Sequence, residues 1–386
     1  MNKDSIYVND PKASKYLFYS TEKSNTERIV DESVSVVVPL FRPRKVFFSE
    51  ALNSLALQEH DVEEHIFVFD GWFEKWAEFE ILSLFPDAHL IKLERNVGQG
   101  SARNLGVKKS SCKWVAFLDQ DDLWAPDHIS DLVFGTRYGE FSLGYSDIKE
   151  IDANGFVTEK SMMYNTVVLG MNSLIKKEIS DLLFRDMMIF PSSAIVDRVK
   201  FDSVGGFAEG LKGHEDDFGF RKLLQEFPNH FYCDSVTASW RTHSSGASGS
   251  ISMSESRLAY SKILLSEFRD DVSIKKGISN RLSKSFLREL IAAASIPNNS
   301  QFDLYRGNCV AFLKVTKEFN TTIKFRYRIM FLLKNPKLLV LFVNILITLR
   351  KLLVAPEFTI KIKFINPFSL FFRIVRFLGR RIRETK

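Results

Sequence analysis

The feature of this sequence that most constrains its fold is an alternation of short apolar runs with helix-like segments between residues 33 and 119. The runs are rich in β-branched and aromatic residues, which is typical of buried strands. The segments between them carry apolar residues at helical spacing, as in FFSEALNSLALQ. Strand and helix thus alternate four times within about ninety residues, which predicts a parallel sheet covered by helices. The apolar runs are SVSVVVPLF, IFVF, HLIKLER and WVAFLD.

Polar residues directly follow three of these predicted strands. Residues 39–44 (PLFRPR) end the first strand, Asp70 ends the second, and residues 119–122 (DQDD) end the fourth. Ligands of parallel sheets collect at the carboxyl ends of the strands. We therefore expect these three sites to border one crevice.

Three carboxylates, those of Asp119, Asp121 and Asp122, stand within four positions at the end of the fourth strand. Carboxylates this close raise each other's pKa unless positive charge lies among them. Oxygen ligands at this spacing suit Mg²⁺ or Mn²⁺, and such an ion would neutralise the diphosphate of a nucleotide leaving group. A lone DxD is often a solvated loop. Here a buried strand precedes it and Trp124 and Pro126 follow it, which favours a cation site.

Six motifs occur in one order between residues 33 and 248: VSVVVPLF, VFDG, RNVGQGSARNLGV, FLDQDDLWAPDHI, VGGFAEGLKGHEDDFGFR and WRTH. In this order the sequence resembles a family 2 glycosyltransferase with the GT-A fold. The resemblance implies an α/β domain with a Rossmann-like, mostly parallel central sheet flanked by helices. It also implies an enzyme that moves a sugar from a nucleotide-sugar to an acceptor hydroxyl with inversion.

The resemblance gives expected roles at the nucleotide edge. Asp70 resembles the residue that reads the base, and Arg103 resembles one that borders the nucleotide site. The chain departs from the family where VFDG replaces the frequent Asp-Asp-Gly-Ser and where PLF replaces Pro-x-Tyr-Asn, so base and ribose contacts differ. The expected nucleotide-sugar contacts are Pro39, Phe41, Asp70, Arg103, Asp119 and Gln120.

The expected cofactor is Mg²⁺ or Mn²⁺, and the DxD acids are its expected ligands. His243 of WRTH is expected to ligate the ion or to touch the diphosphate, and its alternative interpretation is a surface histidine with satisfied hydrogen bonds. The expected metal ligands are Asp119, Asp121, Asp122 and His243.

The resemblance also places the general base in GHEDD, at the start of a helix whose dipole favours acids. Reading GHED as the family's Gly-x-Glu-Asp makes Asp216 the base, whereas counting back from Arg221 makes it Glu215. We favour Asp216 and expect Asp217 to order the loop. Such a base must lie within hydrogen-bond reach of the hydroxyl that it deprotonates.

The net charge of +6 is unevenly distributed. Residues 321–386 hold fifteen Lys/Arg and two Asp/Glu, a balance of +13, so the other residues carry 6 − 13 = −7. The longest uncharged run of this tail, residues 338–349, has twelve residues, short of the roughly 20 that span a bilayer. Bases recurring among Phe, Ile, Val and Leu favour an amphipathic helix in the membrane interface. Packing onto the catalytic domain is the alternative, and the apolar density disfavours nucleic-acid binding.

The sequence predicts four regions. Residues 1–32 form a lead-in, residues 33–256 the catalytic domain, residues 257–326 a helical segment, and residues 327–386 a basic amphipathic tail that associates with membranes. Three scattered cysteines are too few for a disulfide framework or a zinc site. Because the first residues lack an apolar signal region, we expect a cytoplasmic protein, peripheral on the inner face of the cell membrane.

These features together predict a metal-dependent transferase. Its donor would be a nucleotide-sugar, with a UDP-sugar favoured, and its acceptor a lipid-linked or cell-envelope glycan. One alternative is a polyprenyl-phosphate sugar synthase, which would need less of a base. Another is a non-catalytic membrane-bound scaffold, which the buried acids disfavour because they cost stability without a task. A sugar nucleotidyltransferase is disfavoured because the first strand lacks a glycine-rich, arginine-containing phosphate loop.

Overall fold

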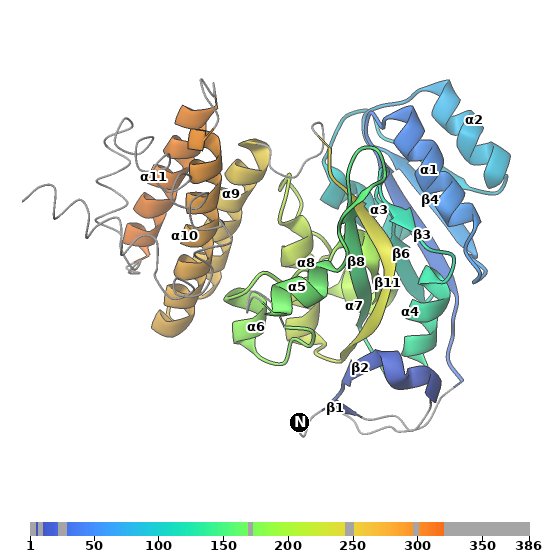
Figure 1. The fold of residues 1–386 in the computed structure, drawn as a ribbon, viewed down its shortest axis with the longest axis horizontal. Coiled ribbons are helices and arrows are strands. Elements are labelled where there is room, and N and C mark those ends of the chain that lie inside the picture. Colours follow the sequence, from blue (N-terminus) through green and yellow to red (C-terminus); the bar gives the residue numbers. More distant parts are fainter. Residues whose placement is uncertain are drawn as a thin grey trace, which may run out of the picture. The chain divides into compact units, whose positions relative to one another are not determined.

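Figure 1 shows the computed structural model, in which the chain forms two compact units, residues 1–278 and residues 279–386. The first unit holds the central sheet, and the described residues of the second, 279–295 and 301–319, are largely helical. The structure describes residues 5–6, 11–21, 29–168, 173–243, 251–295 and 301–319.

The predicted alternation of strands and helices is confirmed in the first unit. Four parallel strands lie in the order β6-β3-β4-β5, and a helix follows each of the first three strands along the chain. This order brings the carboxyl ends of β3, β4 and β6 to one edge of the sheet. The elements are β3 (Val34–Leu40), α1 (Lys45–Ala56), β4 (Glu64–Phe69), α2 (Lys75–Leu84), β5 (His89–Lys92), α3 (Gln99–Lys109) and β6 (Trp114–Phe117).

Strand β3 is buried on both faces, which explains its unbroken apolar sequence. Val36 and Val38 belong to a core that includes buried residues of α1 and α2. Val37 points to the opposite face, where a Cβ at Gly106 of α3 would lie 2.3 Å from a Val37 methyl carbon. Glycine at position 106 therefore lets α3 pack directly on the sheet.

Beyond β6 the sheet becomes mixed. Strand β10 (Ala194–Asp197) is antiparallel to both β6 and β8 (Leu143–Ile151), whereas β11 (His230–Arg241) runs parallel to β8. The α/β class with a central sheet flanked by helices is confirmed, and the antiparallel strands on one side make the sheet mixed. Strand β7 (Leu123–Trp124) pairs with β11 just beyond the acidic turn.

The segment YSDIKEID-ANG-FVTEK forms a β-hairpin, as its Ala-Asn-Gly turn predicts. Strand β9 (Val157–Glu159) folds back antiparallel on β8. In the turn, the Asp152 carboxylate accepts hydrogen bonds from the backbone N–H groups of Asn154 and Phe156, at 2.8 and 3.0 Å.

Part of the lead-in adds two strands at one edge of the same sheet. Strand β2 (Tyr16–Tyr19) pairs antiparallel with residues 230–233 of β11, and β1 (Ser5–Ile6) pairs with β2. The Phe18 ring is 1% exposed and stacks on Phe141 at a centroid distance of 5.6 Å. The lead-in thus supplies core side chains, which its polar composition did not predict.

Further helices complete the two units. Arg221 of α8 joins α8 to α9 by a two-pronged ion pair with Glu267, with both N–O distances between 3.0 and 3.1 Å. In the second unit, Phe286 of α10 stacks on Phe312 of α11 at 4.7 Å. The remaining elements are η1 (Pro11–Lys15), α4 (His128–Thr136), α5 (Met162–Val168), α6 (Ile179–Leu183), η2 (Pro191–Ser193), α7 (Arg198–Ser203), α8 (Glu215–Glu226), α9 (Ile251–Glu267), α10 (Val272–Ser295) and α11 (Phe302–Glu318).

Within the described ranges, none of the helices has the length and apolar character needed to cross a membrane. The predicted amphipathic tail, residues 327–386, lies outside the described residues.

Candidate active site

The acidic turn after β6 directs its three carboxylates to different surroundings. The side chain of Asp119 is 27% exposed and that of Asp121 is 25% exposed, whereas Asp122 is only 3% exposed. Asp119 and Asp121 thus face the open edge of the sheet and Asp122 faces the interior.

Asp122 is held from two sides. Its Oδ2 accepts a hydrogen bond from Ser192 Oγ at 2.6 Å, and its Oδ1 accepts one from the Arg241 backbone N–H at 2.9 Å. Burial, together with the negative charges of Asp121 and Asp119, raises the pKa of Asp122 well above its usual range. Its predicted role as a metal ligand stays a prediction.

Asp121 lies beside His243, with 2.8 Å between Asp121 Oδ2 and His243 Nε2. The Phe47 ring of α1 packs on the imidazole at a centroid distance of 5.1 Å. Burial raises the pKa of Asp121, and the hydrogen bond from His243 opposes that rise. The structure therefore brings together two of the predicted metal ligands from segments 122 residues apart.

Arg103 of α3 links the acidic turn to the start of α8. Its guanidinium is 1% exposed and binds Asp119 Oδ1 at 2.5 Å and Glu215 Oε1 at 3.0 Å. The Phe207 ring covers the guanidinium at 5.3 Å. Burial by itself would lower the pKa of Arg103, but the charges of Asp119 and Glu215 outweigh it and the pKa is raised. A buried cation with two carboxylate partners is thus permanently charged here.

Glu215 is 1% exposed at the first position of α8. One of its oxygens, Oε1, accepts hydrogen bonds from both Arg103 and Gln99, the latter at 2.5 Å. Its N-cap residue, His214, has a left-handed backbone (φ 64°), which turns the chain abruptly into the helix. Glu215 is therefore an internal partner of Arg103.

Asp216, the next residue, is half-buried and has a different environment. Its Oδ1 accepts a hydrogen bond from the Asp217 backbone N–H at 2.8 Å. Burial, with the charges of Glu215 and Asp217, raises the pKa of Asp216 to about 8, against the opposing charge of Arg103. A carboxyl group with a pKa in this range can take up and release a proton near neutral pH.

Asp70 holds the loop between β5 and α3. Its carboxylate accepts hydrogen bonds from the side chain of Asn96 (2.9 Å) and from the backbone N–H groups of Val97 (2.6 Å) and Gly98 (2.9 Å). Next to it, Gly71 has φ +66°, and a Cβ there would lie 2.0 Å from the Asn96 backbone nitrogen. Asp70 therefore binds the two loops together, and its predicted contact with a base stays a prediction.

The other predicted nucleotide contacts lie on the first strand and the acidic turn. Gln120 pairs with the backbone of Phe41 in both directions: Phe41 N–H donates to Oε1 at 2.8 Å and Nε2 donates to Phe41 C=O at 3.2 Å. Pro39 is buried within β3, opposite Val68 of β4. Gln120 thus fixes the loop after β3 against the acidic turn.

Three residues that sequence reasoning missed complete the site. Ser192 binds the acidic turn, Gln99 binds Glu215, and Glu50 of α1 accepts from Arg241 Nη2 at 2.5 Å. Nothing in the sequence around Ser192 or Glu50 indicates a site. Ser192 is one short polar side chain among others, and Glu50 reads as an ordinary acid on a helix surface. Gln99 stands within RNVGQGSARNLGV, one of the six motifs that carried the resemblance.

The donor pair formed by Asp121 and His243 fits a divalent ion. One atom is a carboxylate oxygen and the other an imidazole nitrogen, and they lie at hydrogen-bond distance, 2.8 Å apart. Among the described residues there is no group of three or more His, Cys, Asp or Glu side chains arranged around one ion. Mg²⁺ commonly uses one or two carboxylates together with waters and substrate phosphates. The residues present therefore suit a site that the nucleotide completes.

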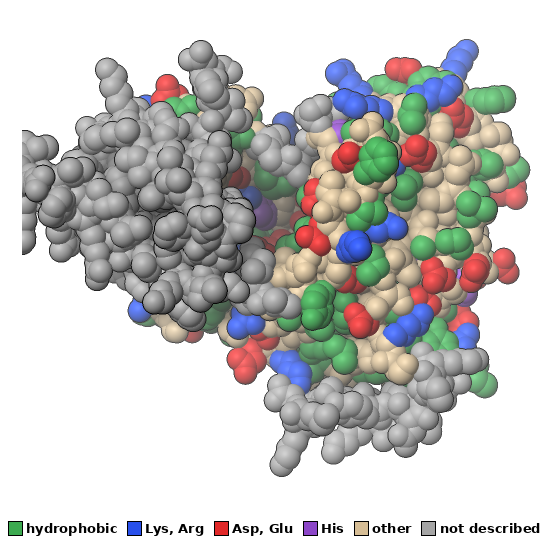
Figure 2. Space-filling view, in the orientation of Figure 1, with side chains coloured by type: hydrophobic (Ala, Val, Ile, Leu, Met, Phe, Trp, Pro, Cys, Tyr) green, Lys and Arg blue, Asp and Glu red, His purple; other side chains and the backbone are tan. Residues whose placement is uncertain are grey.

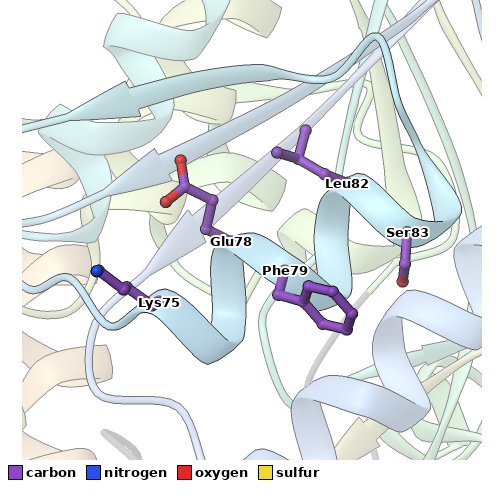
Figure 3. A pocket seen from close by; sticks show the side chains of 5 residues that line it. All are labelled: Lys75, Glu78, Phe79, Leu82 and Ser83. Atoms are coloured by element: carbon purple, nitrogen blue, oxygen red, sulfur yellow. The ribbon is translucent and has the colours of Figure 1, made fainter.

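A shallow hollow on the outer face of α2 lies apart from this constellation (Figure 3). All of its lining residues belong to that one helix, so it is an open helix face. They are Lys75, Glu78, Phe79, Leu82 and Ser83.

Comparison with known proteins agrees with this geometry. Residues 35–201 match the model of glycosyl transferase family 2, so the resemblance predicted from the six motifs is confirmed for this segment. Over 160 residues the chain is 31% identical to the putative teichuronic acid biosynthesis glycosyltransferase TuaG of Bacillus subtilis, which is 38% of this chain and 62% of that protein. An uncharacterized glycosyltransferase of Rickettsia bellii is 32% identical over 126 residues, 32% of this chain.

The chain spans only part of these curated relatives, 18% of the length of the Rickettsia bellii protein and 62% of TuaG. Among solved structures, S. aureus TarS 1-349 in complex with UDP-GlcNAc superimposes with a TM-score of 0.52 at 17% identity. The superposition covers 73% of this chain and 81% of that one. It shows that the two proteins share a fold.

Proposed function

Residues 35–201 are a family 2 glycosyltransferase domain, and from this premise we propose that the chain transfers a sugar from a nucleotide-sugar to an acceptor hydroxyl in a single inverting displacement. The observation that carries the proposal is the link made by Arg103. This buried cation binds Asp119 on the acidic turn and Glu215 beside Asp216. It therefore holds the expected donor-binding edge and the expected base in one arrangement.

Asp216 is the proposed general base, and its surroundings support that role over Glu215. Glu215 is fully buried and bound to Arg103 and Gln99. Asp216 is half-buried and has a pKa of about 8. Its carboxylate would accept the proton of the acceptor hydroxyl as the oxygen attacks the anomeric carbon.

Asp121 and His243 are the proposed holders of Mg²⁺ or Mn²⁺, with Asp119 beside them. When bound, the ion supplies positive charge that neutralises the departing diphosphate. Arg103 holds Asp119 in place through Oδ1, so that Oδ2 can accept a hydrogen bond from a nucleotide hydroxyl.

The proposed donor is a UDP-sugar and the proposed acceptor a cell-envelope glycan. The first follows the UDP-GlcNAc complex of TarS, and the second follows the name of TuaG. On the face of the first unit seen in Figure 2, acidic, basic and hydrophobic side chains are interspersed. That face offers no single-sign patch of the kind that nucleic acids bind.

Membrane association and a lipid-linked acceptor rest on the sequence of residues 327–386 alone. Each basic residue near an anionic leaflet contributes about 1 kcal/mol. We expect the full-length chain to float with vesicles that contain anionic lipid and to remain behind with neutral vesicles. Equal recovery with both kinds of vesicle would contradict an electrostatic, interfacial tail.

The proposed donor site is tested by calorimetric titration of UDP into the full-length chain, with and without Mn²⁺. We expect the wild type to bind UDP only with Mn²⁺, and we expect this metal-dependent binding to be lost in Asp121→Asn, because the substitution removes a ligand charge. Glu78→Gln changes an acid on the outer face of α2 and is expected to bind as the wild type does. Binding that is equally tight without metal would refute the metal site, and binding of a different nucleotide alone would refute the UDP assignment.

A further inference from the structure

Building on the proposed function, we infer that Asp122 is the internal anchor of the acidic turn and does not ligate the ion. We further infer that Ser192 and Arg241 are positioning residues, which set the side chains of Asp119 and Asp121 through that anchor. Asp122 thereby differs in role from Asp119 and Asp121, although the three acids stand together in the sequence.

The contacts of Asp122 are those of a buried structural carboxylate. Its two oxygens accept from opposite sides, Oδ2 from η2 through Ser192 and Oδ1 from β11 through the Arg241 backbone. The residue is 3% exposed, whereas Asp119 and Asp121 are about a quarter exposed at the edge of the sheet. A carboxylate that reaches an ion shared with a nucleotide must face that edge, and Asp122 faces away from it.

Ser192 binds the turn at three points. Its hydroxyl oxygen accepts from the Asp119 backbone N–H at 3.1 Å while the hydroxyl donates to Asp122 at 2.6 Å. Its carbonyl oxygen accepts from the indole N–H of Trp124 at 2.6 Å. Ser192 is completely buried, so no water replaces these bonds. One side chain therefore joins the beginning of the acidic turn to its end.

Arg241 holds the same turn from the other side. Besides its backbone bond to Asp122, its Nε donates to the Asp121 carbonyl oxygen at 2.9 Å, and its Nη2 binds Glu50. Its guanidinium also packs on the Phe47 ring at 4.6 Å. Because His243 lies two residues further along the chain, the contacts of Arg241 also fix where the imidazole meets Asp121.

Residues that orient metal ligands without touching the metal have measurable effects. Removal of such a partner typically lowers metal affinity by about 10–100-fold, because the ligands lose their fixed direction. Replacing a metal ligand itself removes a negative charge from the ion's surroundings. Replacing an orienting residue therefore weakens metal-dependent binding of UDP, whereas replacing a ligand abolishes it. Replacing a structural anchor also lowers the melting temperature.

The test uses four single substitutions in the full-length chain, arranged as two matched pairs. Ser192→Ala removes the hydroxyl that joins the turn, and Ser193→Ala removes the neighbouring buried hydroxyl, which donates only to the Phe190 carbonyl at 3.0 Å. Asp122→Asn keeps the shape of the anchor, and Asp121→Asn keeps the shape of the proposed ligand. Two quantities are measured: the affinity for UDP with and without Mn²⁺, by calorimetry well below the melting temperature, and the melting temperature itself.

We expect Ser192→Ala to bind UDP with Mn²⁺ about 10–100-fold more weakly than Ser193→Ala does. Asp122→Asn should keep metal-dependent UDP binding, with its melting temperature lowered by about 5 °C, whereas Asp121→Asn should lose the metal-dependent binding and melt near the wild type. Equal affinities of the two serine variants would overturn the role of Ser192. Loss of metal-dependent UDP binding in Asp122→Asn without a change in melting temperature would make Asp122 a ligand.

Failure of the proposed function gives a different result. If the wild type binds UDP without any metal requirement, the proposed cation site is refuted. The melting temperatures still decide whether Asp122 anchors the turn, because that comparison needs no ligand. A wild-type melting temperature in both Asp122→Asn and Ser192→Ala would refute the anchor.

Discussion

Replacing Asp216 with asparagine is expected to lower kcat by about 10²–10⁴-fold, with the affinity for the nucleotide nearly unchanged. Asparagine keeps the size of the side chain and still accepts the hydrogen bond from the Asp217 backbone, so α8 should begin as before. It cannot take the proton of an acceptor hydroxyl. The measurement is sugar transfer from a UDP-sugar at saturating donor, together with calorimetric binding of UDP.

The matched control is Asp217→Asn in the same helical turn, which should retain kcat within about threefold because Asp217 is not the proposed proton acceptor. A wild-type rate in Asp216→Asn with a large loss in Glu215→Gln would move the base to Glu215. Wild-type rates in both variants would favour the alternative acceptor, a polyprenyl phosphate, which needs no base.

The raised pKa of Asp216 also predicts two pH dependences of opposite sign. Only the ionised carboxylate can act as a base, so kcat/KM should rise as the pH increases through about 8. The folded protein binds the Asp216 proton more tightly than the unfolded chain does. The contribution of this group to stability is therefore fully present below its unfolded pKa, about 4, and is lost as the pH rises through about 8. Asp216→Asn should abolish the first dependence and weaken the second, as measured by rate–pH profiles and by urea unfolding at several pH values.

Arg103→Met is the second large effect, and it acts on stability as well as on activity. The substitution leaves Glu215 buried without its cation and Asp119 without its partner. Breaking a buried ion pair from one side typically costs about 3–5 kcal/mol, because the remaining charge is left uncompensated in a poorly polar interior. We expect the free energy of unfolding to fall by about this amount, measured by urea denaturation with far-UV circular dichroism.

A second substitution should recover part of that loss. Glu215→Gln removes the stranded charge and keeps a hydrogen-bonding group for Gln99, so the double variant Arg103→Met/Glu215→Gln should be more stable than Arg103→Met. A coupling of about 1–3 kcal/mol in the double-mutant cycle would measure the interaction. For comparison, Lys92→Met breaks the partly exposed pair with Glu78 and should change stability by less than about 1 kcal/mol. Equal effects of the Arg103 and Lys92 substitutions would contradict the importance of burial.

Much of the catalytic half could be predicted because its signals are local. The alternation between residues 33 and 119 sets a strand or a helix from the spacing of neighbouring side chains, and the parallel order then follows from the short connections. The acids of the DQDD and GHEDD motifs could be assigned to strand and helix ends for the same reason. The sequence also predicted the hairpin after β8, since a turn with Asn-Gly depends on adjacent residues.

The parts that could not be predicted depend on residues far apart in the chain. Strand β2 pairs with β11 more than 200 positions away, and no periodicity in the lead-in signals that pairing. Strand β10 likewise lies between β6 and β8, antiparallel to both. This position depends on the unpaired edges that β6 and β8 offer in the folded sheet, which no local pattern signals.

The sequence by itself determined the α/β class, the resemblance of its motifs to a glycosyltransferase family and the residues that stand at the carboxyl edge of the sheet, because these depend on local pattern. The tertiary structure alone decided what each acid does there. Asp122 turns inward to Ser192, Asp121 meets His243, and Arg103 joins Asp119 to Glu215. The physical reason is that burial and long-range hydrogen bonds set the charge and direction of a carboxylate, and both arise only when distant segments pack together.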